Sequence, residues 1–221
     1  MNAKTTKQIE EMMNQTIGVE VEMNNITRTK AAQIAAEFFG TRRHENTAGR
    51  NGYCTYSAWD SEGREWKFQK DVSIHGPDSE KCELVTPILT YADMETLQEL
   101  IRRLRRAGAK SDATRSCGVH IHIGAKGHTA QTLRNLANIM ASHETLLASA
   151  LNLDRNRMNR YCRTVSKDFL VELNRKKPKT MAALADTWYG SQNADYGRSA
   201  HYNERRHRAG SPTKTRAATI C

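Results

Sequence analysis

Two segments of this chain alternate apolar with ionisable side chains, and this alternation constrains the fold more than any other feature. Residues 17–23 read IGVEVEM, and residues 117–124 read CGVHIHIG. Successive side chains of a β-strand point to opposite faces of the sheet, so each segment predicts a strand with one apolar and one polar face. The apolar face is expected to pack on helices, which leaves the acidic and imidazole side chains on the other face.

The remaining pattern predicts further strands and helices around these two segments. The predicted strands are 17–23, 53–59, 65–74, 82–86 and 117–124, and the predicted helices are 27–40, 93–107, 129–151 and 180–188. The third helix is predicted to face inward with Leu133, Leu136, Ile139, Met140, Leu146 and Leu147. Strands joined by both helices and hairpins indicate an α+β domain with a mainly antiparallel sheet and helices packed on one face.

Composition excludes several classes of protein. The chain has 221 residues and no stretch near the ~20 apolar residues that cross a bilayer, so no membrane partner is expected. Its five cysteines are widely spaced and form no CxxC pair, which argues against a disulfide scaffold and favours a reducing compartment. The charged N-terminus lacks the apolar core of a signal peptide, so a cytoplasmic protein is expected.

The formal net charge of +10 is concentrated near the C-terminus. Residues 160–221 carry 13 Lys and Arg against 5 Asp and Glu. A basic region can bind nucleic acid, but no recognisable nucleic-acid-binding module accompanies this one. A basic nucleic-acid-binding protein is therefore an alternative that the charge alone supports.

Glu20 and Glu22 stand one pleat apart on the same face of the first strand. Two carboxylates at this spacing repel each other unless a cation lies between them, and such a pair can supply oxygen ligands to Mg²⁺ or Mn²⁺. The same pattern also occurs on strands that only face solvent. Glu83 in CELVT and Asp71 in KDVSI are uninformative alone, since either can be an ordinary surface carboxylate.

His120 and His122 share one face of the second alternating strand. Two imidazoles side by side can share a metal, or one can bind a metal and the other a substrate phosphate. A purely structural pair is the alternative, and it requires a hydrogen-bond partner for each buried ring. The glutamate and histidine strands together predict one polar face of a single sheet, which solvent exposure alone does not explain.

The ordered motifs resemble the amidoligase family. These motifs are GVEVEM, KDVSI, CELVTPIL followed by a helix, and CGVHIHIG followed by a second helix, and they span residues 17–163. The family is a divergent branch of the carboxylate–amine ligase fold that glutamine synthetase and glutamate–cysteine ligase share. The resemblance implies that ATP phosphorylates a carboxylate and that an amine attacks the acyl phosphate to give an amide. Divalent cations would neutralise the phosphates.

The resemblance also implies a role for each candidate residue. Glu20 and Glu22 would be ligands of two neighbouring Mg²⁺ ions, Glu83 would join this set, and His120 would be a metal ligand or phosphate contact. His122 would contact nucleotide or phosphate, and Asp71 would orient the substrate or amine at the mouth of the site. Arg160 and Arg163, in the segment NRYCR, occupy the place of a phosphate-binding arginine of the family, and the resemblance does not say which of them acts.

The chain departs from the family pattern at its end. Residues 200–204 begin like the family segment that leads into a strand with a Glu-x-Arg motif, but residues 205–221 contain neither the motif nor a strand pattern. The expectation is an incomplete catalytic domain over residues 1–204, followed by a basic irregular tail over 205–221. The sequence does not indicate whether a product shortened in this way is active.

Three functions are therefore open from the sequence. The first is an ATP-dependent carboxylate–amine ligase that acts on small-molecule, peptide or protein substrates. The second is a metal-dependent hydrolase or oxygenase that uses the histidine strand and a carboxylate as a transition-metal site. The third is the basic nucleic-acid-binding protein. The sequence indicates neither the identity of the acid and the amine nor the oligomeric state.

Overall fold

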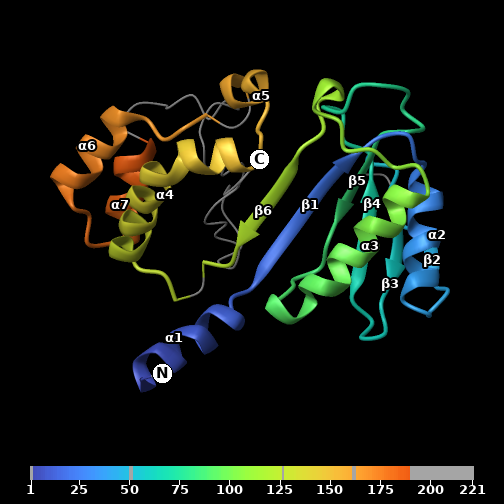
Figure 1. The fold of residues 1–221 in the computed structure, drawn as a ribbon, viewed down its shortest axis with the longest axis horizontal. Helices are drawn as coiled ribbons and strands as arrows, with labels where there is room; N and C mark the ends of the chain where they lie inside the picture. Colours follow the sequence, from blue (N-terminus) through green and yellow to red (C-terminus); the bar gives the residue numbers. More distant parts are fainter. Residues whose placement is uncertain (1, 50–51, 126, 161–162, 190–221) are drawn as a thin grey trace. The chain divides into compact units, whose positions relative to one another are not determined.

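The computed structural model describes residues 2–49, 52–125, 127–160 and 163–189. The chain divides into two compact units, and the boundary lies between Gly124 and Ala125. The first unit contains the sheet and the second is helical (Figure 1).

The first unit is built on a six-stranded sheet in the order β2-β3-β4-β5-β1-β6, in which every pair of neighbours is antiparallel. Its strands are β1 (Ile17–Met23), β2 (His44–Asn46), β3 (Tyr56–Trp59), β4 (Glu65–Gln69), β5 (Cys82–Val85) and β6 (Val119–Ile123). Both alternating segments of the sequence are strands, and they are direct neighbours, β1 beside β6 (Figure 1). The two alternating segments, which are far apart in the sequence, therefore lie side by side in the sheet.

Three helices belong to this unit: α1 (Ala3–Met13), α2 (Arg28–Phe38) and α3 (Met94–Arg106). Thr27 caps α2 by accepting a hydrogen bond from Lys30 N at 3.2 Å, as an N-cap threonine does. Small side chains of α2 let it approach the sheet closely, and leucines of α3 fill the space beside it. The buried helix residues are Ala31, Ala32, Ala35, Ala36, Leu97, Leu100 and Leu104.

The apolar face of the sheet forms one core with α2 and α3. Val19 and Val21 of β1, Trp66 and Phe68 of β4 and Leu84 of β5 are buried in the same cluster as the helix residues. These are the alternate positions of each strand, so the opposite positions lie on the other face of the sheet. The predicted α+β class, with a mainly antiparallel sheet, is confirmed.

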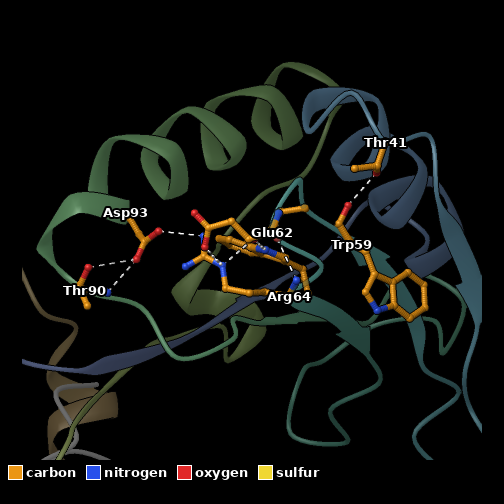
Figure 2. A network of polar contacts seen from close by, with 8 residues as sticks. Thr41, Trp59, Glu62, Arg64, Thr90 and Asp93 are labelled. Carbon is orange, nitrogen blue, oxygen red and sulfur yellow. Dashed lines mark hydrogen bonds and ion pairs between the residues drawn. The ribbon is translucent and has the colours of Figure 1, made fainter.

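A polar network ties the β3–β4 turn to the beginning of α3 (Figure 2). Asp60 in the turn accepts hydrogen bonds from Trp66 Nε1 at 2.9 Å and from Arg64 Nε at 2.8 Å. Arg64 Nη2 lies 2.9 Å from Asp93 Oδ1, and Asp93 precedes α3 directly. This network satisfies the buried indole N–H and fixes the hairpin against the helix.

The second unit contains α4 (Ala130–Ala150), α5 (Arg155–Arg160), α6 (Lys167–Lys176) and α7 (Met181–Tyr189). Its core contains Ala130 and Ala137 of α4 with Leu173 of α6 and Leu184 of α7. Within the described part of the chain, no helix combines the length and apolarity that crossing a membrane requires.

The predicted inward face of α4 is wrong at two positions. Ile139 and Leu146 are 57% and 65% exposed, whereas the buried positions of α4 are Ala130, Ala137 and Glu144. These three residues recur every seven positions, so they form one stripe along the helix. Small side chains on this stripe admit α6 closely, and the larger side chains at 139 and 146 lie off it.

Candidate active site

The polar face of the sheet gathers ionisable side chains from three adjacent strands. Strand pairing places Glu22 of β1 opposite Glu83 of β5, and it places Glu20 of β1 opposite His120 of β6. Directly opposed residues share a face, with Cβ atoms ~5 Å apart. His122 follows on the same face of β6, opposite Gly18. The register of the sheet therefore determines which side chains form this cluster.

Glu20 bridges the two histidines. Its Oε2 atom lies 3.1 Å from His120 Nδ1, and its Oε1 atom lies 3.1 Å from His122 Nε2. Burial alone would raise the pKa of Glu20, but the hydrogen bonds and charge of both histidines outweigh burial and hold this pKa well below its usual range. The hydrogen bond to Glu20 in turn raises the pKa of His120, with burial opposing it.

Glu22 and Glu83 are buried, at 3% and 4% exposure. Glu22 Oε2 accepts a hydrogen bond from Gly118 N at 2.7 Å, and Glu83 Oε2 accepts one from Gln69 Nε2 at 2.8 Å. Burial, followed by the charge of Glu20, raises the pKa of Glu83 to about 8. This carboxyl group therefore keeps its proton at neutral pH when no cation is bound.

Asp71 joins the cluster from a turn. The prediction of a strand through residue 74 is wrong, because β4 ends at Gln69 and the chain turns at residues 72–73. The Asp71 carboxylate favours this turn by accepting a hydrogen bond from Ser73 N at 2.6 Å. Ser73 Oγ also donates to Glu22 Oε1 at 3.4 Å, which brings the turn against β1.

Two groups of possible ligand atoms result from this arrangement. One oxygen or nitrogen from each of Glu20, Glu83 and His120 lies within 4.8 Å of the others, and the same holds for Glu22, Asp71 and Glu83. Glu83 belongs to both groups. Carboxylate oxygens suit Mg²⁺ or Mn²⁺, and an imidazole nitrogen suits transition metals such as zinc or iron.

Two observations support ligand binding by these residues, the first of a divalent cation and the second of a further polar ligand. Burial, together with the charge of the neighbouring carboxylates, keeps Glu83 protonated, and a cation would compensate this charge. The Nδ1 atom of His122 is buried without a hydrogen-bond partner among the described residues, so it is available to an incoming ligand. The cluster therefore has the donor chemistry of a cation site.

The two predicted arginines lie at the end of α5 and just after it. Arg160 ends α5, and Arg163 is exposed and donates from Nε to the Asn159 carbonyl at 2.9 Å. Both belong to the second unit. Their role at a phosphate stays a prediction.

Three residues that hold the cluster in place were not predicted from the sequence. Gln69 and Ser73 bind Glu83 and Glu22 through their side chains, and Gly118 binds Glu22 through its backbone N–H. Alternation along β4 could have indicated Gln69, because it places Glu65, Lys67 and Gln69 on the polar face. The Ser73 and Gly118 contacts depend on turns that carry no distinctive sequence signal.

The fold and the cluster define a class of protein, namely an α+β protein with acidic and imidazole side chains gathered on the polar face of its sheet. A family model described as "putative amidoligase enzyme" matches residues 13–220. The chain therefore belongs to this amidoligase family. No curated protein and no solved structure matches it.

The family match extends past Glu204, where the sequence predicted the catalytic domain to end. Residues 190–221 lie outside the described part of the chain. The proposed boundary at 204 and the irregular tail over 205–221 therefore stay predictions.

Proposed function

We propose that this chain is an ATP-dependent ligase that joins a carboxylate to an amine through an acyl phosphate. The observation that supports this most is the cluster of four carboxylates and two imidazoles on the sheet, of which Glu22 and Glu83 are directly opposed and buried. Membership of the amidoligase family supports a ligase reaction. The chemistry of the donor set extends this to a cation-dependent phosphoryl transfer.

The residues that would hold Mg²⁺ or Mn²⁺ are Glu20, Glu22, Glu83, Asp71 and His120. A bound cation would supply positive charge to the phosphate oxygens during transfer. ATP would supply the phosphoryl group that activates the carboxylate, so that an amine can displace phosphate.

The remaining tasks belong to the chain's own side chains. Glu20 holds the His120 ring through Nδ1, which fixes the orientation of the imidazole. His122, whose buried Nδ1 has no hydrogen-bond partner among the described residues, would contact nucleotide or phosphate. Asp71, half-buried and held by Ser73, orients the amine at the edge of the cluster.

The arginines of the second unit complete the proposal. Arg160 and Arg163 would contact the transferred phosphate, since a guanidinium matches phosphate oxygens in a bidentate manner. Substitution of each arginine alone by Gln distinguishes them. The arginine that contacts phosphate should affect kcat, and the other should leave it within about twofold of wild type.

A second function is supported by the Glu20 bridge. Two histidines and one carboxylate on a shared face also resemble the facial arrangement that binds a transition metal in hydrolases and oxygenases. Metal analysis of the purified chain separates the two functions. Stoichiometric zinc, iron or manganese that survives dialysis supports the hydrolase or oxygenase, and a weakly held divalent cation supports the ligase.

The proposed function is tested by product formation. The purified chain is incubated with ATP and Mg²⁺, with amino acids or peptides as acids and amines, and ADP release is measured. ADP should appear only when the acid and the amine are both present, and it should disappear with Glu20→Gln. ADP release that ignores the acid and the amine, or that survives this substitution, would contradict the proposal.

A further inference from the structure

Arg28 occupies an unfavourable position in α2. It is the first residue of the helix, where the helix dipole disfavours a cation, and the first turn contains no acidic residue. Its guanidinium instead donates to three backbone carbonyls outside the helix. Nε donates to Cys54 O at 3.1 Å, and Nη1 donates to Asp78 O at 2.7 Å and to Lys81 O at 2.6 Å.

These contacts act on one segment, residues 70–81, which connects β4 to β5 and carries Asp71. Two of the carbonyls, those of Asp78 and Lys81, lie at the far end of this segment. The third belongs to Cys54, and the neighbouring Tyr53 carbonyl accepts a hydrogen bond at 2.7 Å from the backbone N–H of Lys70, the residue before Asp71. A single side chain thus joins the start and the end of the segment through backbone groups.

The other side-chain contacts at the ends of this segment are weaker. Lys70 and Lys81 lie 3.2 Å and 3.0 Å from Asp78 carboxylate oxygens, but the Asp78 side chain is 67% exposed. Exposed ion pairs of this kind contribute ~0–1 kcal/mol. The carbonyls bound by Arg28 therefore provide the stronger constraint at these ends.

We infer that Arg28 is a positioning residue for the candidate cation site, and that it acts on Asp71 through the backbone of residues 70–81. Glu22 and Glu83 do not need this constraint, because strand pairing in β1 and β5 already fixes them. Asp71 lies between β4 and the turn at residues 72–73, so its approach to both glutamates depends on how the segment is held. The segment is held locally by the contact of Ser73 with Glu22 and at its ends by Arg28. The inference rests on the cation site of the proposed function.

The constraint on the segment is tested without any metal. Amide hydrogen exchange is compared in the wild-type chain, Arg28→Ala and the control Lys30→Ala. Lys30 is a cation of the same helix, and its Nζ donates to a single carbonyl, that of Ala107, at 3.1 Å. Exchange over residues 70–81 should accelerate in Arg28→Ala and stay at the wild-type rate in Lys30→Ala. Equal exchange in all three chains would overturn the inference.

The effect on the site is measured as Mn²⁺ affinity by electron paramagnetic resonance. Loss of groups that orient metal ligands typically costs about 10–100-fold in affinity, so the Kd of Arg28→Ala should rise about tenfold or more. A double-mutant cycle tests whether Arg28 affects the affinity through Asp71. In an Asp71→Asn background, Arg28→Ala should change the Kd by less than about twofold, because the residue that it positions has lost its charge.

The outcomes separate this inference from the proposed function. A wild-type chain that binds no Mn²⁺ would contradict the proposed function. If the wild type binds Mn²⁺ and Arg28→Ala has the same Kd, the role of Arg28 is overturned and the proposed function stands. The same holds if the effects of Arg28→Ala and Asp71→Asn on the Kd are fully additive. If Arg28→Ala does not fold, Arg28→Lys replaces it under the same criteria, because an ammonium group cannot reproduce the planar fork of the guanidinium.

Discussion

Glu22 and Glu83 stand directly opposite each other on neighbouring strands, and both are almost completely buried. Like charges in this arrangement destabilise a sheet unless a proton or a cation compensates them. In the metal-free chain the compensation comes from a proton, because burial and the charge of Glu20 raise the pKa of Glu83 to about 8. In the proposed function, a divalent cation would replace that proton, and the same pair would serve as ligands.

Glu83→Gln is therefore expected to separate stability from cation binding. The amide keeps the shape of the side chain but cannot ionise, whereas at pH 9 the buried Glu83 carboxyl of the wild type loses its proton at a cost to the folded state. At pH 9 the unfolding free energy of the metal-free variant should therefore exceed that of the wild type by about 1 kcal/mol or more. Its Mn²⁺ affinity should fall at least about tenfold. Urea unfolding and Mn²⁺ titration check the two effects, and a variant that gains no stability contradicts the assigned protonation of Glu83.

The raised pKa of Glu83 also predicts the pH dependence of the metal-free chain. The unfolded chain loses this proton near pH 4.5 and the folded chain near pH 8, so the folded state binds more protons between these values. The contribution of Glu83 to unfolding free energy is present below about pH 4.5 and is lost as the pH rises to about 8. Stability measured against pH for wild type and Glu83→Gln should converge at low pH, and parallel curves would refute this assignment.

Cation binding at pH 7 should release protons. Glu83 carries a proton there in the metal-free chain, and a ligand carboxylate must lose it. Calorimetric titration of Mn²⁺ in two buffers of different ionisation enthalpy should show a difference that corresponds to about one proton or more per bound ion. Identical heats in both buffers would exclude proton displacement from the site.

Glu20→Gln is expected to lower the pKa of His120. The hydrogen bond to Glu20 is the main cause of the raised pKa of this imidazole, and a neutral amide no longer favours its protonated form. Titration of the ring by nuclear magnetic resonance measures the change. As a matched control, Glu45→Gln alters an exposed glutamate of β2 and should leave the His120 titration unchanged.

Asp60→Ala should destabilise the chain without weakening the cation site. The substitution leaves the buried Trp66 indole N–H without its acceptor and removes one partner of Arg64, a loss of about 2 kcal/mol. Glu62→Ala, at an exposed contact of the same arginine, should cost less than about 0.5 kcal/mol. Both variants should bind Mn²⁺ as wild type does. A loss of affinity in Asp60→Ala beyond its loss of stability would link this network to the site.

The strands that carry the site could be predicted because their signal is local. Alternation defines β1 over the residues expected, and it assigns Glu20, Glu22, His120 and His122 to the polar side of their strands. The opposition of Glu22 and Glu83 could not be predicted, because sheet register depends on contacts between segments about 60 residues apart. The sequence suggested the components of the cluster, and strand pairing determines which of them meet.

Contacts made to backbone groups, and the helices of the second unit, could not be predicted as well as the strands. The role of Arg28 depends on carbonyl groups that any residue type could supply, so no sequence pattern indicates it. Helix α6 was missed because it is rich in charged residues and buries only Leu173. The inward face of α4 was predicted from its large side chains; Leu133 does pack against the helical core, but the fully buried apolar residues of this helix are the alanines Ala130 and Ala137.

The most direct test of the central claim is nucleotide binding with and without a divalent cation. A non-hydrolysable ATP analogue is titrated into the wild-type chain, Glu22→Gln and the control Glu45→Gln, each with Mg²⁺ and with EDTA. The proposed site predicts cation-dependent binding by the wild type and the control, and at least about tenfold weaker binding by Glu22→Gln. Binding that is equally strong in EDTA, or that Glu22→Gln leaves unchanged, would contradict a cation-dependent nucleotide site on this sheet.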